Sequence, residues 1–216
     1  MRMRKKKHTE ERISACSYLL ATPEGETGAF RKRFPGEGNE KKELRLEIGC
    51  GKGAFLLETA KREPHVLFLG VEICREALMA AMEKIRDAGL SNVLFLSLDA
   101  AKLGEVLSPG EVDCIYLNFS DPWPKSRHAK RRLTAPSFLA LYRALLREGG
   151  CIRQKTDNVP LFEYSLSQYE AEGWRCENIC RDLHASPEAE GNVLTEYEKN
   201  FAGKGMKILS VTAYKE

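Results

Sequence analysis

The chain has 216 residues, of which 43% are hydrophobic and 30% are charged, with a formal net charge of +3. This length and composition predict a globular α/β domain and exclude a disordered chain. No apolar run approaches the roughly 20 residues of a membrane span, and none follows the basic N-terminus as a secretory signal requires. We therefore expect a cytoplasmic protein that contacts nucleic acid, if at all, through a local basic patch.

The cysteine pattern indicates reduced thiols. The chain has seven cysteines, an odd number, and several lie in apolar runs. Such a pattern is typical of a cytosolic protein rather than of a disulfide framework. Cys176, Cys180 and His184 lack the second ligand pair that structural zinc sites usually show, so we expect no metal.

Strand-like and helix-like segments alternate along most of the chain. Residues 1–40 are basic and then rich in loops, with a possible short helix at 13–20, and we expect them to form an arm. Residues 41–216 are expected to form a single domain. The expected strands are 44–48, 66–72, 93–98, 112–119, 151–155, 174–180 and 208–214, and the expected helices are 53–62, 75–88, 102–107, 136–146 (capped by Thr134) and 160–172. This alternation predicts a doubly wound, mostly parallel seven-stranded sheet with helices on both faces, a Rossmann-like α/β fold.

A glycine-rich turn follows the first expected strand. Its glycines are Gly49, Gly51 and Gly53. Glycines at such a turn let the backbone approach a ligand closely. Their spacing is neither the G-x-G-x-x-G of dinucleotide-binding folds nor a Walker loop. A plain tight turn remains an alternative.

Single acids follow the next two expected strands. Glu72 is placed to accept the ribose hydroxyls of a nucleoside, and Asp99 to lie beside its base. Either acid alone is often only a helix cap. Together with the glycine turn they resemble class I S-adenosylmethionine-dependent methyltransferases, whose methyl donor has no pyrophosphate.

The fourth expected strand ends in Asp121, which lies in a Ser-Asp-Pro-Trp-Pro-Lys segment. Two prolines stiffen this segment, and ligands in open α/β sheets bind beyond the carboxyl ends of the strands. Residues 125–132 contain five cations and no acid. A solvated helix face usually mixes both signs, so this run favours a long anionic substrate, RNA or DNA. Trp123 either stacks on a base or packs against the protein.

Residues 120–134, Ser-Asp-Pro-Trp-Pro-Lys-Ser-Arg-His-Ala-Lys-Arg-Arg-Leu-Thr, resemble the signature of bacterial tRNA (guanine-N7-)-methyltransferases. The glycine turn with Glu47, and the segments 70–72, 98–100, 155–158 and 195–198, are similar to further blocks of that family. The resemblance runs from about residue 44 to the C-terminus and is weak over residues 14–42.

The resemblance implies methyl transfer from S-adenosylmethionine to a guanine in the variable loop of tRNA. It implies donor contacts by Glu47, Glu72, Asp99 and Asp121, with Asp121 also the candidate catalytic residue. The implied acceptor contacts are Lys125, Asp157, Thr195, Glu196, Tyr197 and Glu198, and the implied RNA contacts are Arg127, His128, Lys130, Arg131 and Arg132. The expected partner is tRNA, with no membrane and no metal, and the expected state is a monomer or homodimer.

Three alternatives remain open from the sequence. A methyltransferase of the same fold acting on another nucleic acid or on protein is the nearest. A non-catalytic RNA-binding protein on this fold is the second, although the intact glycine turn disfavours it. The glycine spacing also disfavours a nicotinamide-dependent oxidoreductase, the third.

Overall fold

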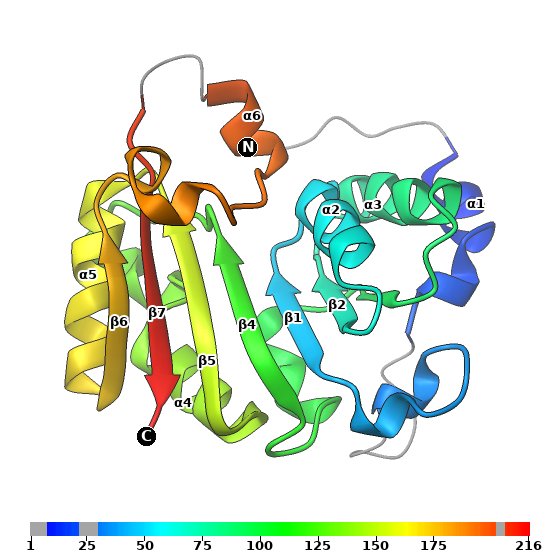
Figure 1. Cartoon of the computed structure of the whole chain (residues 1–216), viewed down its shortest axis with the longest axis horizontal. Helices are drawn as coiled ribbons and strands as arrows, with labels where there is room; N and C mark the ends of the chain where they lie inside the picture. The colour runs from blue at the N-terminus through cyan, green and yellow to red at the C-terminus, as the bar shows by residue number, and fades with distance from the viewer. Residues whose placement is uncertain (1–7, 22–29, 202–205) are drawn as a thin grey trace. The chain divides into compact units, whose positions relative to one another are not determined.

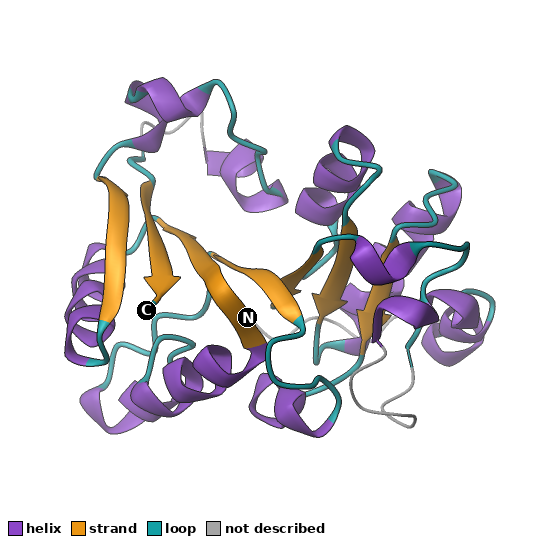
Figure 2. Ribbon diagram, turned by 60° about the horizontal axis from the view of Figure 1, so that its bottom comes forward, coloured by secondary structure: helices purple, strands orange, loops and turns teal. Residues whose placement is uncertain are grey.

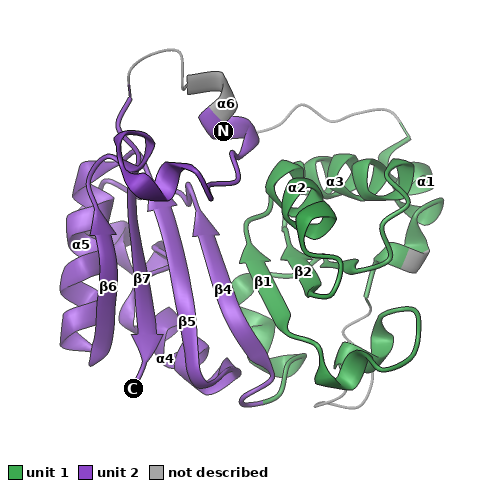
Figure 3. Cartoon of the chain, viewed as in Figure 1, with its two compact units in different colours: residues 1–108 green, residues 109–216 purple. Residues whose placement is uncertain are grey.

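The computed structural model describes residues 8–21, 30–201 and 206–216, and the chain forms two compact units, Met1–Ser108 and Pro109–Glu216 (Figures 1 and 3). The basic run at residues 1–7 lies outside the described residues. Within the described residues, no helix is both long enough and apolar enough to cross a bilayer.

Unit 1 contains three parallel strands, β1 (Leu44–Ile48), β2 (Leu67–Val71) and β3 (Val93–Leu96). The helices α2 (Ala54–Arg62) and α3 (Arg75–Asp87) connect them. β2 and β3 are buried at every residue, as expected of parallel strands that are covered on both faces. Gly70 shows how closely the layers pack, because a Cβ there would lie 2.6 Å from Leu56 of α2 and 2.8 Å from Phe95 of β3.

The residues before β1 attach to unit 1. Those of them that the structure describes form α1 (Thr9–Ser14) and three 3-10 turns, Ser17–Leu19, Phe30–Arg33 and Asn39–Lys41. Arg12 makes a two-pronged contact with Glu83 of α3, and the amide of Ala21 donates to the carbonyl of Phe95 at 2.8 Å. The helix predicted at 13–20 is therefore shorter and begins earlier, where Glu10 and Glu11 favour a helix N-terminus.

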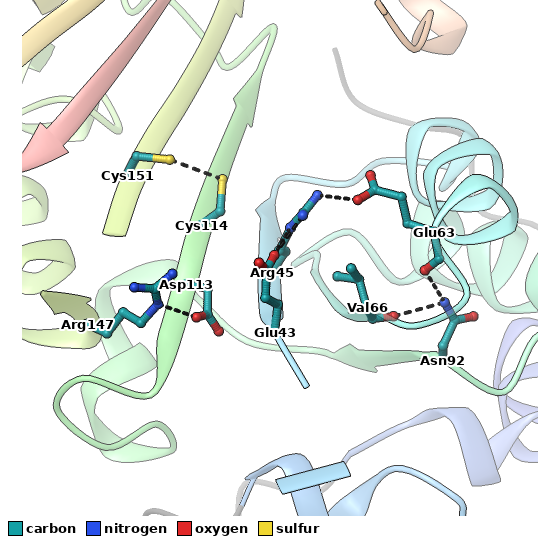
Figure 4. A network of polar contacts seen from close by, with 9 residues as sticks. All are labelled: Glu43, Arg45, Glu63, Val66, Asn92, Asp113, Cys114, Arg147 and Cys151. Atoms are coloured by element: carbon teal, nitrogen blue, oxygen red, sulfur yellow. Dashed lines mark hydrogen bonds and ion pairs between the residues drawn. The ribbon is translucent and has the colours of Figure 1, made fainter. Parts of the chain in front are cut away.

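Polar side chains form hydrogen bonds and ion pairs at the N-terminal ends of these strands. Arg45 bridges Glu43 and Glu63, while the Asn92 amide donates to the carbonyls of Glu63 and Val66 (Figure 4). Asn92 is 7% exposed. Its bonds satisfy carbonyls at the end of α2 and in the loop before β2, which would otherwise be costly to bury.

Unit 2 contains β4 (Val112–Asn118), β5 (Leu146–Thr156), β6 (Trp174–Cys180) and β7 (Leu209–Lys215). β4 and β5 are parallel, whereas β7 is antiparallel to both β5 and β6. Cys114 and Cys151 face each other across β4 and β5, with their sulfurs 3.7 Å apart as free thiols (Figure 4). The longer helices are α4 (Pro136–Leu145) and α5 (Val159–Ala171), and α6 (Glu196–Phe201) is short (Figure 1). Figure 2 distinguishes the helices, strands and loops of the chain by colour.

The seven strands follow the order β3-β2-β1-β4-β5-β7-β6, which confirms the predicted mostly parallel seven-stranded sheet. Two further local predictions were wrong. The helix predicted at 102–107 is a 3-10 turn, Ala100–Glu105, which begins earlier because Asp99 caps it. Thr134 does not cap α4; its hydroxyl bonds Ser165 of α5 at 2.8 Å, and Ala135 occupies the cap position.

The packing around Gly70 gives a stability test. We expect Gly70→Ala to lower the free energy of unfolding by about 1–3 kcal/mol, because the new methyl group overpacks a full interior. Gly191 is the matched control, since a Cβ there meets nothing within 4 Å. Urea unfolding of both variants measures the difference, and equal stability would contradict the packing.

Candidate functional site

The glycine turn of unit 1 lies between β1 and α2 and has left-handed backbone at all three glycines. The φ angles of Gly49, Gly51 and Gly53 are 75°, 55° and 71°. The amides of Gly49 and Cys50 donate to the carbonyl of Val71, which fixes the turn to the end of β2. A Cβ at Gly49 or Gly51 would meet nothing within 4 Å, so these two glycines present bare backbone to open space.

Gly53 has a different role, because it sets the distance between two helices. A Cβ at this position would lie 2.8 Å from the Cβ of Ala81 on α3. Only glycine combines a positive φ with this close approach. Gly53 therefore allows α2 to start against α3 and orients the turn.

Glu72 is bonded to the glycine turn. Its Oε2 accepts from the amide of Gly51 at 2.9 Å, and its Oε1 accepts from the amide of Cys74 at 2.7 Å. Each carboxylate oxygen has a further lone pair. The structure thus brings two predicted donor residues together, and a half-buried carboxylate lies where it can accept hydroxyl groups.

Asp99 follows β3 and is exposed, and its Oδ1 accepts from the amide of Ala101 at 3.0 Å. The carboxylate therefore serves as a local cap, the simpler of its two expected roles, and its other oxygen is at the protein surface.

Glu47 is 3% exposed and lies near the end of β1. Burial raises the pKa of the adjacent Cys50 thiol well above its usual value, and the nearby carboxylates of Glu47 and Glu72 raise it further. Cys50 is therefore a protonated thiol that packs beneath the turn.

These features fit a nucleoside-type methyl donor. The turn offers open space at two glycines, and a carboxylate is bonded to its edge. No phosphate-binding spacing is present, which suits a ligand without pyrophosphate. S-adenosylmethionine, when bound, would be held here by this backbone and by Glu72.

The turn after β4 in unit 2 carries Asp121. Phe119 and Trp123 flank it with φ angles of 53° and 42°, both in the left-handed region. For bulky side chains this backbone is strained, and it persists only where surrounding contacts hold it. The amide of Phe119 donates to the carbonyl of Lys155 at 2.8 Å, and Asp121 itself is exposed.

Most of the basic stretch, residues 125–132, forms the 3-10 turn Ser126–Arg131, with Lys125 and Arg132 at its N-terminal and C-terminal cap positions. The guanidinium of Arg131 lies 4.9 Å from the centre of the Trp123 ring, and His128 meets the ring edge. Trp123 therefore contacts two side chains of the basic stretch. The exposed cations of the stretch are Lys125, Arg127, Lys130 and Arg131.

Arg132 differs from its neighbours in the basic stretch. It is half-buried, and its Nε and Nη2 donate to the carbonyls of Pro122 and Trp123 at 3.0 and 3.1 Å. Its guanidinium also lies 4.2 Å from the centre of the Tyr164 ring on α5.

Asp157, just beyond β5, contacts α6. The Tyr197 hydroxyl donates to its Oδ2 at 2.9 Å, and the Tyr197 ring lies 4.9 Å from the Phe119 ring. Burial and the nearby Asp157 carboxylate raise the Tyr197 pKa. One aromatic pair thus joins the turns after β4 and β5.

A buried ion pair holds the start of α6. Glu198 is fully buried, and its Oε2 lies 2.8 Å from the Nζ of Lys155. The Lys155 ammonium also donates to Asn192 and to the carbonyl of Val193. Thr195 and Glu198 form a reciprocal capping box, in which each side chain accepts from the other residue's amide.

The predicted acceptor residues therefore differ in how far they are buried. Thr195 and Glu198 are buried in the capping box, whereas Tyr197 is exposed and Asp157 half-buried. The T-x-x-E pattern of residues 195–198 is a capping signature that the sequence alone could have revealed. Nothing in the sequence singled out Lys155 as the partner of Glu198, since they are 43 residues apart.

Known proteins resemble this chain over its whole length. A family model described as "Putative methyltransferase" matches residues 41–211. The chain is 40% identical over 216 residues to the tRNA (guanine-N(7)-)-methyltransferase of Lachnoclostridium phytofermentans, covering 100% of this chain and 99% of the relative. It is 42% identical over 214 residues to the protein of the same name from Streptococcus thermophilus, covering 99% and 98%.

Among solved structures, the 16S rRNA methyltransferase KamB matches with a TM-score of 0.62 at 18% identity, over 81% of this chain and 88% of that chain. At this identity the likeness supports the fold alone. It places the chain in the class I S-adenosylmethionine-dependent methyltransferase fold.

The buried ion pair gives a pH-dependent stability test. Burial alone would raise the Glu198 pKa, but Lys155 and the hydrogen bonds from Thr195 and Asn192 lower it below its ordinary value. A depressed carboxyl pKa stabilises the fold above the unfolded value, and this contribution is lost as the pH falls through the folded value. We expect Glu198→Gln to cost about 3–5 kcal/mol at neutral pH, because it leaves the ammonium unpaired.

The difference between wild type and Glu198→Gln should shrink as the pH falls below the ordinary titration range of a glutamate and Glu198 itself becomes protonated. Urea unfolding across this range measures it. Glu190→Gln is the control, because Glu190 is exposed and should show no such dependence. A pH-independent difference would show that charge pairing is not what Glu198 contributes.

Proposed function

The chain belongs to the tRNA (guanine-N(7)-)-methyltransferase family, and we propose that it methylates N7 of a guanine in the variable loop of tRNA, acting in the cytoplasm as a monomer or homodimer. The full-length similarity to proteins of that name carries the proposal. The donor-type turn of unit 1 and the basic stretch of unit 2 support it chemically.

S-adenosylmethionine supplies a methyl group on a positively charged sulfur. Guanine N7 carries an in-plane lone pair and needs no deprotonation, so no residue has to act as a strong base. The protein's task is then mainly to position the two reactants, which is worth roughly 7–11 kcal/mol in well-oriented systems. Ordered turns after β1 and β4 suit that task.

Asp121 and Asp157 have the chemistry to recognise the acceptor. The methylated base gains a positive charge, which a nearby carboxylate stabilises in a partly dry site. A carboxylate also accepts from N1–H and N2–H of guanine but not from the corresponding edge of adenine. We assign Asp121 to the developing charge and Asp157, already oriented by Tyr197, to the guanine edge.

Incubation with labelled S-adenosylmethionine and tRNA transcripts tests the proposal. We expect labelled 7-methylguanosine from transcripts with a guanine in the variable loop and none from transcripts in which adenine replaces it. Label on both transcripts, or on another base, would refute the assigned acceptor.

The role of Asp121 predicts a rate effect without a stability effect. Asp121→Asn should lower the single-turnover rate at saturating donor and tRNA by about 100- to 1,000-fold, as for other removed transition-state contacts. Its thermal unfolding should match wild type because Asp121 is exposed. Glu105→Gln, which also removes an exposed carboxylate, is the control.

The exposed cations of the basic stretch predict a salt effect. Arg127→Ala and Lys130→Ala should each weaken tRNA binding and reduce the slope of log affinity against log salt by about one, because each removes one phosphate contact. Filter binding at several salt concentrations measures the slope. Lys61→Ala on α2 controls for net charge, and an equal decrease there would argue against a localised RNA surface.

A further inference from the structure

Arg132 belongs to a run of cations by sequence, but its contacts are those of a structural residue. Its two hydrogen bonds go to the carbonyls of Pro122 and Trp123, the two residues that directly follow Asp121. The aromatic ring of Tyr164 supports its guanidinium at 4.2 Å. The exposed cations Arg127, Lys130 and Arg131 make no such pair of bonds to the turn within the described residues.

The turn needs an external tether. Trp123 has a φ of 42°, an unfavourable value for a bulky residue. The prolines at 122 and 124 have no N–H, so they cannot stabilise the turn by donating. Side-chain donors can instead bond its carbonyls, and the planar guanidinium of arginine presents two such donors in fixed geometry.

We propose that Arg132 is a positioning residue, which fixes the carboxylate of Asp121 by tethering the turn that carries it, rather than a phosphate contact. The test of this proposal by methylation rate rests on the proposed function, whereas its test by the conformation of the turn does not. It separates Arg132 from Arg131, its neighbour in sequence, which lies exposed over the Trp123 ring.

The conservative variant Arg132→Lys separates the two roles. Lysine keeps the positive charge that a phosphate contact requires, but it lacks the planar fork that reaches two carbonyls. We expect Arg132→Lys to keep the salt slope of tRNA binding while its single-turnover rate at saturating donor and tRNA falls at least tenfold. Arg132→Ala should lose about 100-fold in rate, because small misplacements at a reacting centre have effects of that size.

Arg131→Ala is the matched comparison. It should raise the tRNA concentration for half-maximal rate and reduce the salt slope by about one. A wild-type rate for Arg132→Lys, or a loss of salt slope in Arg132→Ala that matches Arg131→Ala, would overturn the proposal. Thermal unfolding of each variant checks the fold, and Arg132→Lys decides the matter if Arg132→Ala does not fold.

A structural readout is independent of activity. The chain has two tryptophans, so 5-fluorotryptophan labelling gives two fluorine resonances, and Trp174→Phe assigns them. Loss of the tether should split or broaden the Trp123 resonance in Arg132→Lys, because the turn then samples several conformations. Arg131→Ala should shift that resonance but leave it single.

A single sharp Trp123 resonance in Arg132→Lys would refute the tether even if the rate fell. Failure of the wild-type protein to methylate tRNA would refute the proposed function and leave this resonance test valid.

Discussion

Left-handed backbone immediately after a strand is the constraint on which both turns of the candidate site depend. After β1 the chain meets it with Gly49, Gly51 and Gly53, for which such φ values carry no steric cost. After β4 the residues with positive φ are Phe119 and Trp123, and for these bulky side chains such φ values are sterically unfavourable. The first turn is held by backbone bonds to Val71 and by the Glu72 carboxylate, whereas the second combines one backbone bond to Lys155 with side chains from elsewhere in unit 2. Bare backbone suits contact with a ligand, and bulky residues suit the display of a carboxylate.

The contacts that restrain the second turn are themselves anchored. Phe119 packs against Tyr197, and α6 begins at a capping box whose glutamate is paired with Lys155. A fully buried carboxylate is costly to desolvate, so it needs both a counter-charge and several hydrogen bonds. Glu198 has both. The geometry of α6 is thereby fixed relative to β5 within unit 2, and with it the hydroxyl that orients Asp157.

Much of this organisation is predictable from the sequence, because periodicity and turn chemistry act locally. Every predicted strand exists, and 174–180 matches β6 residue for residue. Glu72 directly follows β2 as expected, whereas β3 ends at Leu96, two residues earlier than predicted, so that Asp99 lies in the loop after the strand. The misassigned Thr134 shows the limit. A threonine two residues before a proline fits a helix cap, but the bond to Ser165 spans 31 residues, and no local pattern reports it.

Arg132 is a second residue whose contacts the sequence does not predict. In the sequence, the five cations of residues 125–132 differ little, because a charge pattern counts each of them as one positive charge. The pattern does not predict which groups each cation contacts. An arginine also carries a fixed fork of donors and a flat face, and these act on carbonyls and rings rather than on net charge. Which property matters depends on whether unpaired carbonyls lie within reach. The turn after β4 offers Arg132 the carbonyls of Pro122 and Trp123. Arg132 therefore holds the turn in place, whereas Lys130, two residues earlier, remains at the surface.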